Sequence, residues 1–140
     1  MKNINLGRVL IGGLLAGLIL NIGEFLLNDV ILGTQMREFF ARYRIAEPGG
    51  SFLIVAVSLT FAVGIVMVFL YALIRPRLGP GVKTAIVAGV IMWFGIYLYC
   101  GAIYGMLFRI PLNVTLIALV WGLLEYVIGA IAGAWAYKEA

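Results

Sequence analysis

Two carboxylates interrupt long apolar runs, Glu24 near the N-terminus and Glu125 near the C-terminus. An ionisable side chain at bilayer depth costs about 2.5–3.5 kcal/mol on insertion scales, so each such residue marks a candidate functional position. A carboxyl group in that setting can carry a proton, or it can hold a cationic or hydroxylated ligand. The alternative is structural, with the acids hydrogen-bonding helices together, although such bonds contribute only about 0.6 kcal/mol on average.

Helical spacing supplies these acids with polar and small neighbours. Asn21, Glu24 and Asn28 fall on one stripe of a helix, which Gly13 and Gly17 continue. A comparable stripe around Glu125 consists of Gly122, Gly129 and Gly133. Because small residues let helices approach closely, we expect both stripes to face the bundle interior and each other. Tyrosines of the third apolar run would add hydroxyl donors. The predicted proton- or ligand-binding residues are therefore Glu24, Glu125, Asn21, Asn28, Tyr97 and Tyr104.

Four apolar runs carry these residues. A membrane crossing takes about 20 apolar residues, which predicts spans at about residues 8–29, 50–74, 83–107 and 113–137. The composition agrees, since 64% of the 140 residues are hydrophobic and 11% are charged, whereas a soluble domain is about 25% charged. The sequence therefore predicts an all-α integral membrane protein, with one domain over residues 1–140 that forms a four-transmembrane-helix bundle.

Missing residue types exclude several kinds of chemistry. The chain has no histidine and one cysteine, Cys100. Imidazole acid–base catalysis, His-ligated haem, zinc sites built on His or several Cys, and intrachain disulfides are excluded. We therefore expect no catalytic residues, no metal and no cofactor, and a protein that is not an enzyme. The net charge of +4 is attributed to membrane anchoring rather than to a nucleic-acid partner.

The segment between the first two spans is amphipathic. Met36, Phe39, Phe40 and Tyr43 recur at helical spacing, while arginines occupy the flanks and the opposite face. This pattern predicts a short helix over about residues 34–46, capped by Thr34, that lies in the membrane interface. The same helix could instead form a lid over a pocket or dock a partner.

The turn between the second and third spans is basic and contains Gly and Pro. Pro76 is expected to end the second span, because proline cannot donate the next helical hydrogen bond. The charges of this turn and of the amphipathic segment are expected at lipid headgroups. The predicted interfacial residues are Arg37, Arg42, Arg44, Arg75, Arg77 and Lys83.

Basic residues also indicate an orientation. An even number of spans places both termini on one side together with the second loop, and this side holds six of the ten basic residues. Since cytoplasmic flanks carry an excess of Lys and Arg, both termini are predicted to be cytoplasmic. Six against four leaves insertion in both orientations, with antiparallel dimers, as an alternative.

Three segments carry a resemblance: IGGLLAGLILNIGEFLLN (11–28), YALIRPRLGPGVKTA (71–85) and WGLLEYVIGAIAGAWAYKE (121–139). They resemble a group of small uncharacterised bacterial four-span hypothetical membrane proteins, which have no established function. The resemblance implies a multi-pass protein of the bacterial cytoplasmic (inner) membrane and supplies no mechanism. A weaker similarity links the chain to small multidrug-resistance exporters. This chain departs from them in its length, its second intramembrane acid and its amphipathic loop, so their mechanism is not transferred.

Three functions fit these observations. The first is a non-enzymatic helical module or accessory subunit of a membrane complex, with lipids as partners and a homo-oligomer or larger complex as its assembly. The second is a small proton-coupled transporter or channel that uses Glu24 and Glu125. The third is a lipid- or quinone-binding membrane protein, which requires an apolar groove open toward lipid. A cavity that reaches the acids favours transport, and dry packing around them favours the module.

Overall fold

The computed structural model describes residues 4–138, and every regular element in this range is helical. The elements are α1 (Leu6–Phe25), η1 (Leu26–Ile31), α2 (Gly33–Tyr43), α3 (Gly50–Leu78), α4 (Val82–Trp93), η2 (Phe94–Leu98), α5 (Tyr99–Leu107) and α6 (Leu112–Ala136). The two η elements are π-helical and join their neighbours without a break. Four helical stretches are long and apolar enough to cross a membrane, namely Leu6–Ile31, Gly50–Leu78, Val82–Leu107 and Leu112–Ala136. The prediction of an all-α chain with four such helices is confirmed.

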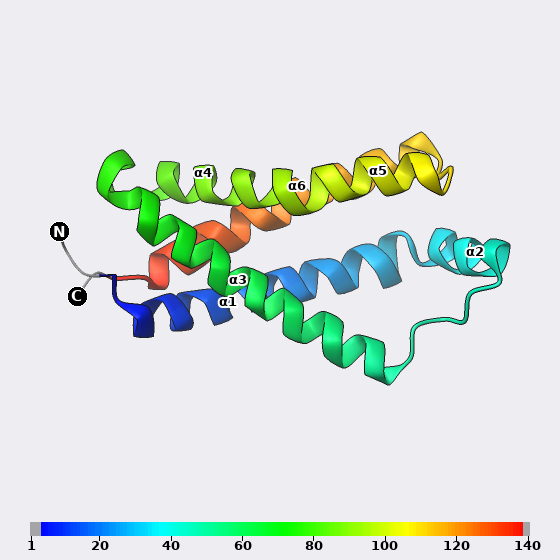
Figure 1. Cartoon of the computed structure of the whole chain (residues 1–140), viewed down its shortest axis with the longest axis horizontal. Coiled ribbons are helices and arrows are strands. Elements are labelled where there is room, and N and C mark those ends of the chain that lie inside the picture. Colours follow the sequence, from blue (N-terminus) through cyan, green and yellow to red (C-terminus); the bar gives the residue numbers. More distant parts are fainter. Residues whose placement is uncertain (1–3, 139–140) are drawn as a thin grey trace.

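The four long helices run back and forth between two ends of the molecule (Figure 1). The start of α1, the end of α6 and the turn between α3 and α4 lie at one end. Helix α2 and the turn between α5 and α6 lie at the other end. This arrangement agrees with the even number of spans.

Small residues set the contacts of α1 with its two neighbours. On one side, Gly13 and Gly17 meet α3, where a Cβ on either glycine would collide with Ile65 or Phe61. On the other side, the backbones of α1 and α6 come so close that a Cβ at Gly12 would collide with a carbonyl of α6. Such close approach is the usual role of glycine in membrane helix packing.

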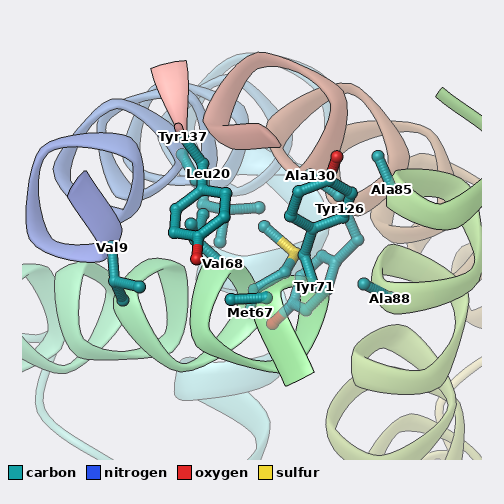
Figure 2. Close-up of a cluster of buried hydrophobic side chains, with 12 residues drawn as sticks. Val9, Leu20, Met67, Val68, Tyr71, Ala85, Ala88, Tyr126, Ala130 and Tyr137 are labelled. Carbon is teal, nitrogen blue, oxygen red and sulfur yellow. The ribbon is translucent and has the colours of Figure 1, made fainter. Parts of the chain in front are cut away.

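Buried side chains gather near the end that holds the chain termini (Figure 2). Met67 and Val68 of α3 and Leu20 of α1 are almost fully enclosed. Tyr71 is also part of this core, and its hydroxyl accepts a hydrogen bond from the Gly81 N–H over 3.1 Å, which attaches the α3–α4 turn to the core. The bundle is therefore held most tightly at this end.

The opposite end is open. The first half of α3 diverges from α4 and α5 (Figure 1), and Phe52, Leu53 and Ile54 are exposed there. A pocket between η1, α5 and α6 lies at this end, and α2 covers it. This loose end positions the candidate functional site.

Two predicted helix boundaries are wrong. Helix α3 continues through Pro76 to Leu78, because a proline this close to the C-terminus removes a single backbone bond. It ends at Gly79, whose φ of 85° a residue with a side chain adopts rarely. Thr34 does not cap α2, which starts one residue earlier, at Gly33, with Leu32 as a cap without a side-chain bond. The chain passes from η1 directly into α2, so a capping turn has no room to form.

Candidate functional site

Glu125 of α6 is the central polar residue of the bundle. Its side chain is 5% exposed, and neither carboxyl oxygen has a hydrogen-bond partner among the described residues. The carboxyl rests against the backbone of α1 at Gly23, where a Cβ would collide with Oε2. Trp121, one turn earlier on α6, donates its indole N–H to the Gly23 carbonyl oxygen over 3.0 Å.

Glu24 of α1 lies beside Glu125. It is partly buried and is held from its own helix, since Asn28 Nδ2 donates to Glu24 Oε2 and to the Glu24 carbonyl oxygen, both over 2.9 Å. The Tyr97 side chain approaches the same carboxyl from η2. The two acids from α1 and α6 therefore form one pair, which we call the acid pair.

Two π-helical segments bring the polar neighbours to the acid pair. Asn28 belongs to η1 and Tyr97 belongs to η2. In η1 the Leu32 N–H bonds to the Leu27 carbonyl oxygen, five residues back, over 2.8 Å. A π-helical turn carries an extra residue and turns the following side chains relative to a continuous α-helix, and such turns occur frequently at functional sites. Both segments lie at the level of the acid pair.

The ring of Tyr97 is fixed by its packing. It lies flat on Gly122 of α6, where a Cβ would be 2.5 Å from its Cδ1. It also meets the Tyr126 ring edge-on, with centroids 5.7 Å apart and an interplanar angle of 74°. Gly122 is therefore required for the close approach of η2 to α6.

A pocket of about 350 Å³ adjoins the acid pair. Its walls come from η1, α2, η2, α5 and the first half of α6, and most lining side chains are apolar or aromatic. Asn28 and Tyr97 line it as well, so these two residues stand between the pocket and Glu24. The pocket reaches the neighbours of the acid pair, while neither acid lines it.

Helix α2 covers this pocket and is attached to the end of α5. The Tyr43 hydroxyl donates to the Phe108 carbonyl oxygen over 2.6 Å. Phe39 meets the Phe108 ring edge-on with centroids 5.7 Å apart, and the Tyr43 ring does so at 5.6 Å. The apolar face that the sequence predicts for this segment is thus turned toward α5 and the pocket.

The six predicted binding residues separate into three groups. Glu24, Glu125, Asn28 and Tyr97 come together. Tyr104 lines the pocket but stacks on Phe108, at 6.0 Å between centroids, away from the acids.

Asn21 faces α3 instead: its Nδ2 donates to the Gly17 carbonyl oxygen over 2.9 Å and to the Val57 carbonyl oxygen over 3.4 Å. The prediction that the stripe of Gly13 and Gly17 faces α6 is wrong, because these glycines pack on α3. Gly23 and Trp121 were missed by the sequence reasoning. A glycine next to an intramembrane acid was the available signal for Gly23.

The predicted interfacial residues lie at the two ends of the molecule. In α2, Arg37 donates to Thr34 Oγ1 over 3.4 Å and Arg42 lines the pocket, while Arg44 caps the helix with a φ of 53°. At the other end, the Arg75 guanidinium lies 5.6 Å from the centroid of the Tyr137 ring. Arg77 and Lys83 are exposed beside the α3–α4 turn.

In the part of the chain that the structure describes, no group of three His, Cys, Asp or Glu side chains could hold a metal ion. The acid pair is surrounded by the amide of Asn28 and the phenol of Tyr97. Such groups can bind protons or organic ligands. Comparison of the chain with protein-family models, with curated proteins and with solved structures finds no match.

Proposed function

We propose that this chain is a small proton-coupled transporter that carries a proton on the acid pair. The observation that carries the proposal is the placement of Glu125, which is buried in one of the four long apolar helices and faces the carboxyl group of Glu24, with no cation beside it among the described residues.

Like charges explain why a proton belongs there. Two carboxylates in contact cannot both be ionised at low cost without a cation, so such pairs share a proton. A shared proton would let one carboxyl donate to the other and link α1 with α6. Loss of that proton would replace the link by repulsion. The charged or polar groups around Glu125 are Glu24, Trp121, Tyr97 and Tyr126, and none of them is a cation.

The pocket offers a place where a ligand could bind next to the acid pair. Asn28 and Tyr97 touch both the pocket and Glu24, so a ligand in the pocket would change the surroundings of the acid pair directly. Binding at one place and proton release at its neighbour are the two requirements of coupling.

The location of the protein belongs to the same proposal. We place it in the bacterial cytoplasmic membrane with both termini in the cytoplasm, which the excess of Lys and Arg on that side supports. Helix α2 then lies in the outer interface, supported by its arginines.

The test uses the purified chain in lipid vesicles with a pH-indicator dye trapped inside. A pH gradient is imposed, first without solute and then with cationic, neutral and anionic solutes in turn. We expect proton flux in at least one condition, lost in Glu125→Gln and kept in Asp29→Asn. Asp29 is the control because it is an exposed acid of the first span and lies outside the acid pair. Absence of flux in every condition, or equal flux in Glu125→Gln, would overturn the proposal.

The second candidate is an accessory subunit or module of a membrane complex. It is favoured by the packing of the acids, neither of which lines the pocket. It is also favoured by the long exposed apolar faces of α3 and of α5, such as Ile54, Tyr99 and Met106. Purification in a mild detergent tests it: a stable complex with other chains supports the module, and a homo-oligomer or monomer contradicts it.

A further inference from the structure

A groove of about 550 Å³ lies on the surface of the bundle between α5 and α6, and we call it the α5–α6 groove. It begins at Arg109, in the turn that joins the two helices, and reaches Ala102 on α5. Seven residues separate these two positions, which is about 10 Å at 1.5 Å per residue. Since one leaflet of the hydrocarbon core is about 15 Å deep, the groove follows a lipid chain over much of one leaflet.

The walls of the groove are apolar and exposed. Met106 of α5 and Leu112 and Leu116 of α6 line it, and all three are exposed on the surface of the bundle. Thr115 and Arg109 are the polar side chains in the lining. Because lipid chains are as apolar as leucine, this part of the groove is complementary to an acyl chain.

Small residues of α5 determine the shape of the groove. A Cβ at Gly105 would lie 3.0 Å from Thr115 Oγ1, and a Cβ at Gly101 would lie 3.0 Å from Leu119 Cδ2. The side chains of α6 therefore pack directly on the backbone of α5, and Ala102 leaves the surface beside this contact hollow. Thr115 and Leu119 line both the groove and the pocket beneath α2, so they form part of the wall between the two.

Arg109 adds a positive charge at the end of the groove that lies at the end of the spans. It is exposed, and its side chain makes no hydrogen bond or ion pair with residues 4–138. No acidic residue lines the groove. The φ of Arg109 is 50°, which glycine or asparagine adopts more readily, so the turn itself does not require an arginine. A negatively charged head group is complementary to this end of the groove.

We propose that the α5–α6 groove binds one anionic phospholipid of the leaflet at the α2 end, with its phosphate on Arg109 and one acyl chain along the two helices toward Ala102. A guanidinium group pairs with phosphate oxygens through two parallel N–H bonds, which fixes the head group in position. The chain would rest on Thr115 and Leu119, and would thereby support the wall of the pocket from outside. The site goes beyond the proposed function, since neither acid of the acid pair lines the groove.

The test compares two phospholipids with identical acyl chains by native mass spectrometry of the purified chain. Phosphatidylglycerol carries a net negative charge, whereas phosphatidylcholine has the same phosphate and no net charge. Each lipid is added at the same concentration to the chain in a mild detergent. We expect about fivefold greater retention of phosphatidylglycerol, which corresponds to about 1 kcal/mol. Equal retention of the two lipids would overturn the inference.

A first pair of variants tests the charge. Arg109→Gln is expected to bring the ratio of the two lipids close to one, because the phosphate contact is lost while the apolar groove remains. Arg44→Gln is the matched control. Arg44 lies at the same end, is exposed, has a similar φ of 53° and lines neither the groove nor the pocket. An equal fall of the ratio in both variants would mean that general surface charge selects the lipid, and would overturn the inference.

A second pair of variants tests the groove. Ala102→Phe is expected to lower the retention of both lipids about tenfold, because the added ring takes the place of about two methylene groups of the chain. Ala56→Phe is the control, since Ala56 is also half-buried but lies on α3, outside the groove. Unchanged retention in Ala102→Phe would place the lipid elsewhere and overturn the inference. Proton flux in the vesicle assay is a separate measurement, and its absence would leave this lipid site untouched.

Discussion

The indole N–H of Trp121 donates to the carbonyl oxygen of Gly23 over 3.0 Å, and so joins α6 to α1 next to the buried carboxyl of Glu125. Gly23 thus contacts α6 in two ways: its carbonyl accepts from Trp121, and its missing side chain leaves space for the acid. Helix spacing at the acid pair depends on this single residue.

Gly23→Ala is expected to lower stability by about 1–3 kcal/mol, because the added Cβ overlaps Glu125 Oε2 and forces the helices apart. Unfolding in mixed micelles, followed by tryptophan fluorescence, measures this change. Gly7→Ala is the control on the same helix, since its Cβ meets only Asn5 Oδ1 at an ordinary 3.5 Å. Equal stability of the two variants would show that the contact at Gly23 is not tight.

Glu125→Leu is expected to be as stable as the parent chain or up to about 4 kcal/mol more stable, because a buried carboxyl that faces a second carboxyl is replaced by an apolar side chain. Glu24→Leu removes an acceptor of Asn28 and is expected to be about 1 kcal/mol less stable. The same unfolding assay compares the two. A marked loss of stability in Glu125→Leu would mean that this acid holds the bundle together, against the proposed function.

Tyr43→Phe removes the hydrogen bond that attaches α2 to the end of α5. A bond of this kind contributes about 1 kcal/mol, which corresponds to about fivefold faster hydrogen exchange if α2 opens locally. Exchange of the α2 amides, measured by mass spectrometry, gives the answer. Tyr99→Phe serves as control, because Tyr99 is exposed and its hydroxyl has no hydrogen bond within residues 4–138. Unchanged exchange in Tyr43→Phe would leave the ring contacts as the attachment of α2.

Replacement of Arg37, Arg42 and Arg44 together by Gln is expected to weaken the attachment of α2 to anionic vesicles, since each basic residue near such a surface contributes about 1 kcal/mol. Protease cleavage within residues 33–49 should become faster in anionic vesicles and should not change in zwitterionic ones. Arg77→Gln with Lys83→Gln, at the opposite end of the molecule, is the control. Unaltered protection of the triple variant would contradict the interfacial position of α2.

The broad architecture was accessible from the sequence because it depends on length and polarity alone. Long apolar runs predicted the four long helices, and the aromatic spacing predicted α2 within a few residues of its bounds. Pro76 was misread because a proline in the last turn removes a single backbone bond, and α3 continues past it to Leu78.

The site was predicted in part. Glu24, Asn28 and Glu125 follow from polarity at membrane depth, and the structure brings them together with Tyr97. Asn21 could not be separated from them, because a straight α-helix would keep Asn21, Glu24 and Asn28 on one stripe. Which helix each stripe contacts depends on the packing of the whole bundle, and α3 packs against Asn21. The π-helical segments have no sequence pattern that the periodicity argument could detect.

Each π-helical segment holds one extra residue, and so determines the direction in which the side chains after it point. In η2, the Tyr99 N–H bonds to the Phe94 carbonyl oxygen, five residues back, as Leu32 does to Leu27 in η1. A regular α-helix over the same number of residues would rotate everything beyond the segment by about 100°. Deletion of one residue from either segment would remove the extra residue and leave the following helix close to its present angle. Elsewhere in these two spans, a one-residue deletion would turn all later side chains by about 100°. The two π-helical segments are therefore the places where these spans can best lose a residue.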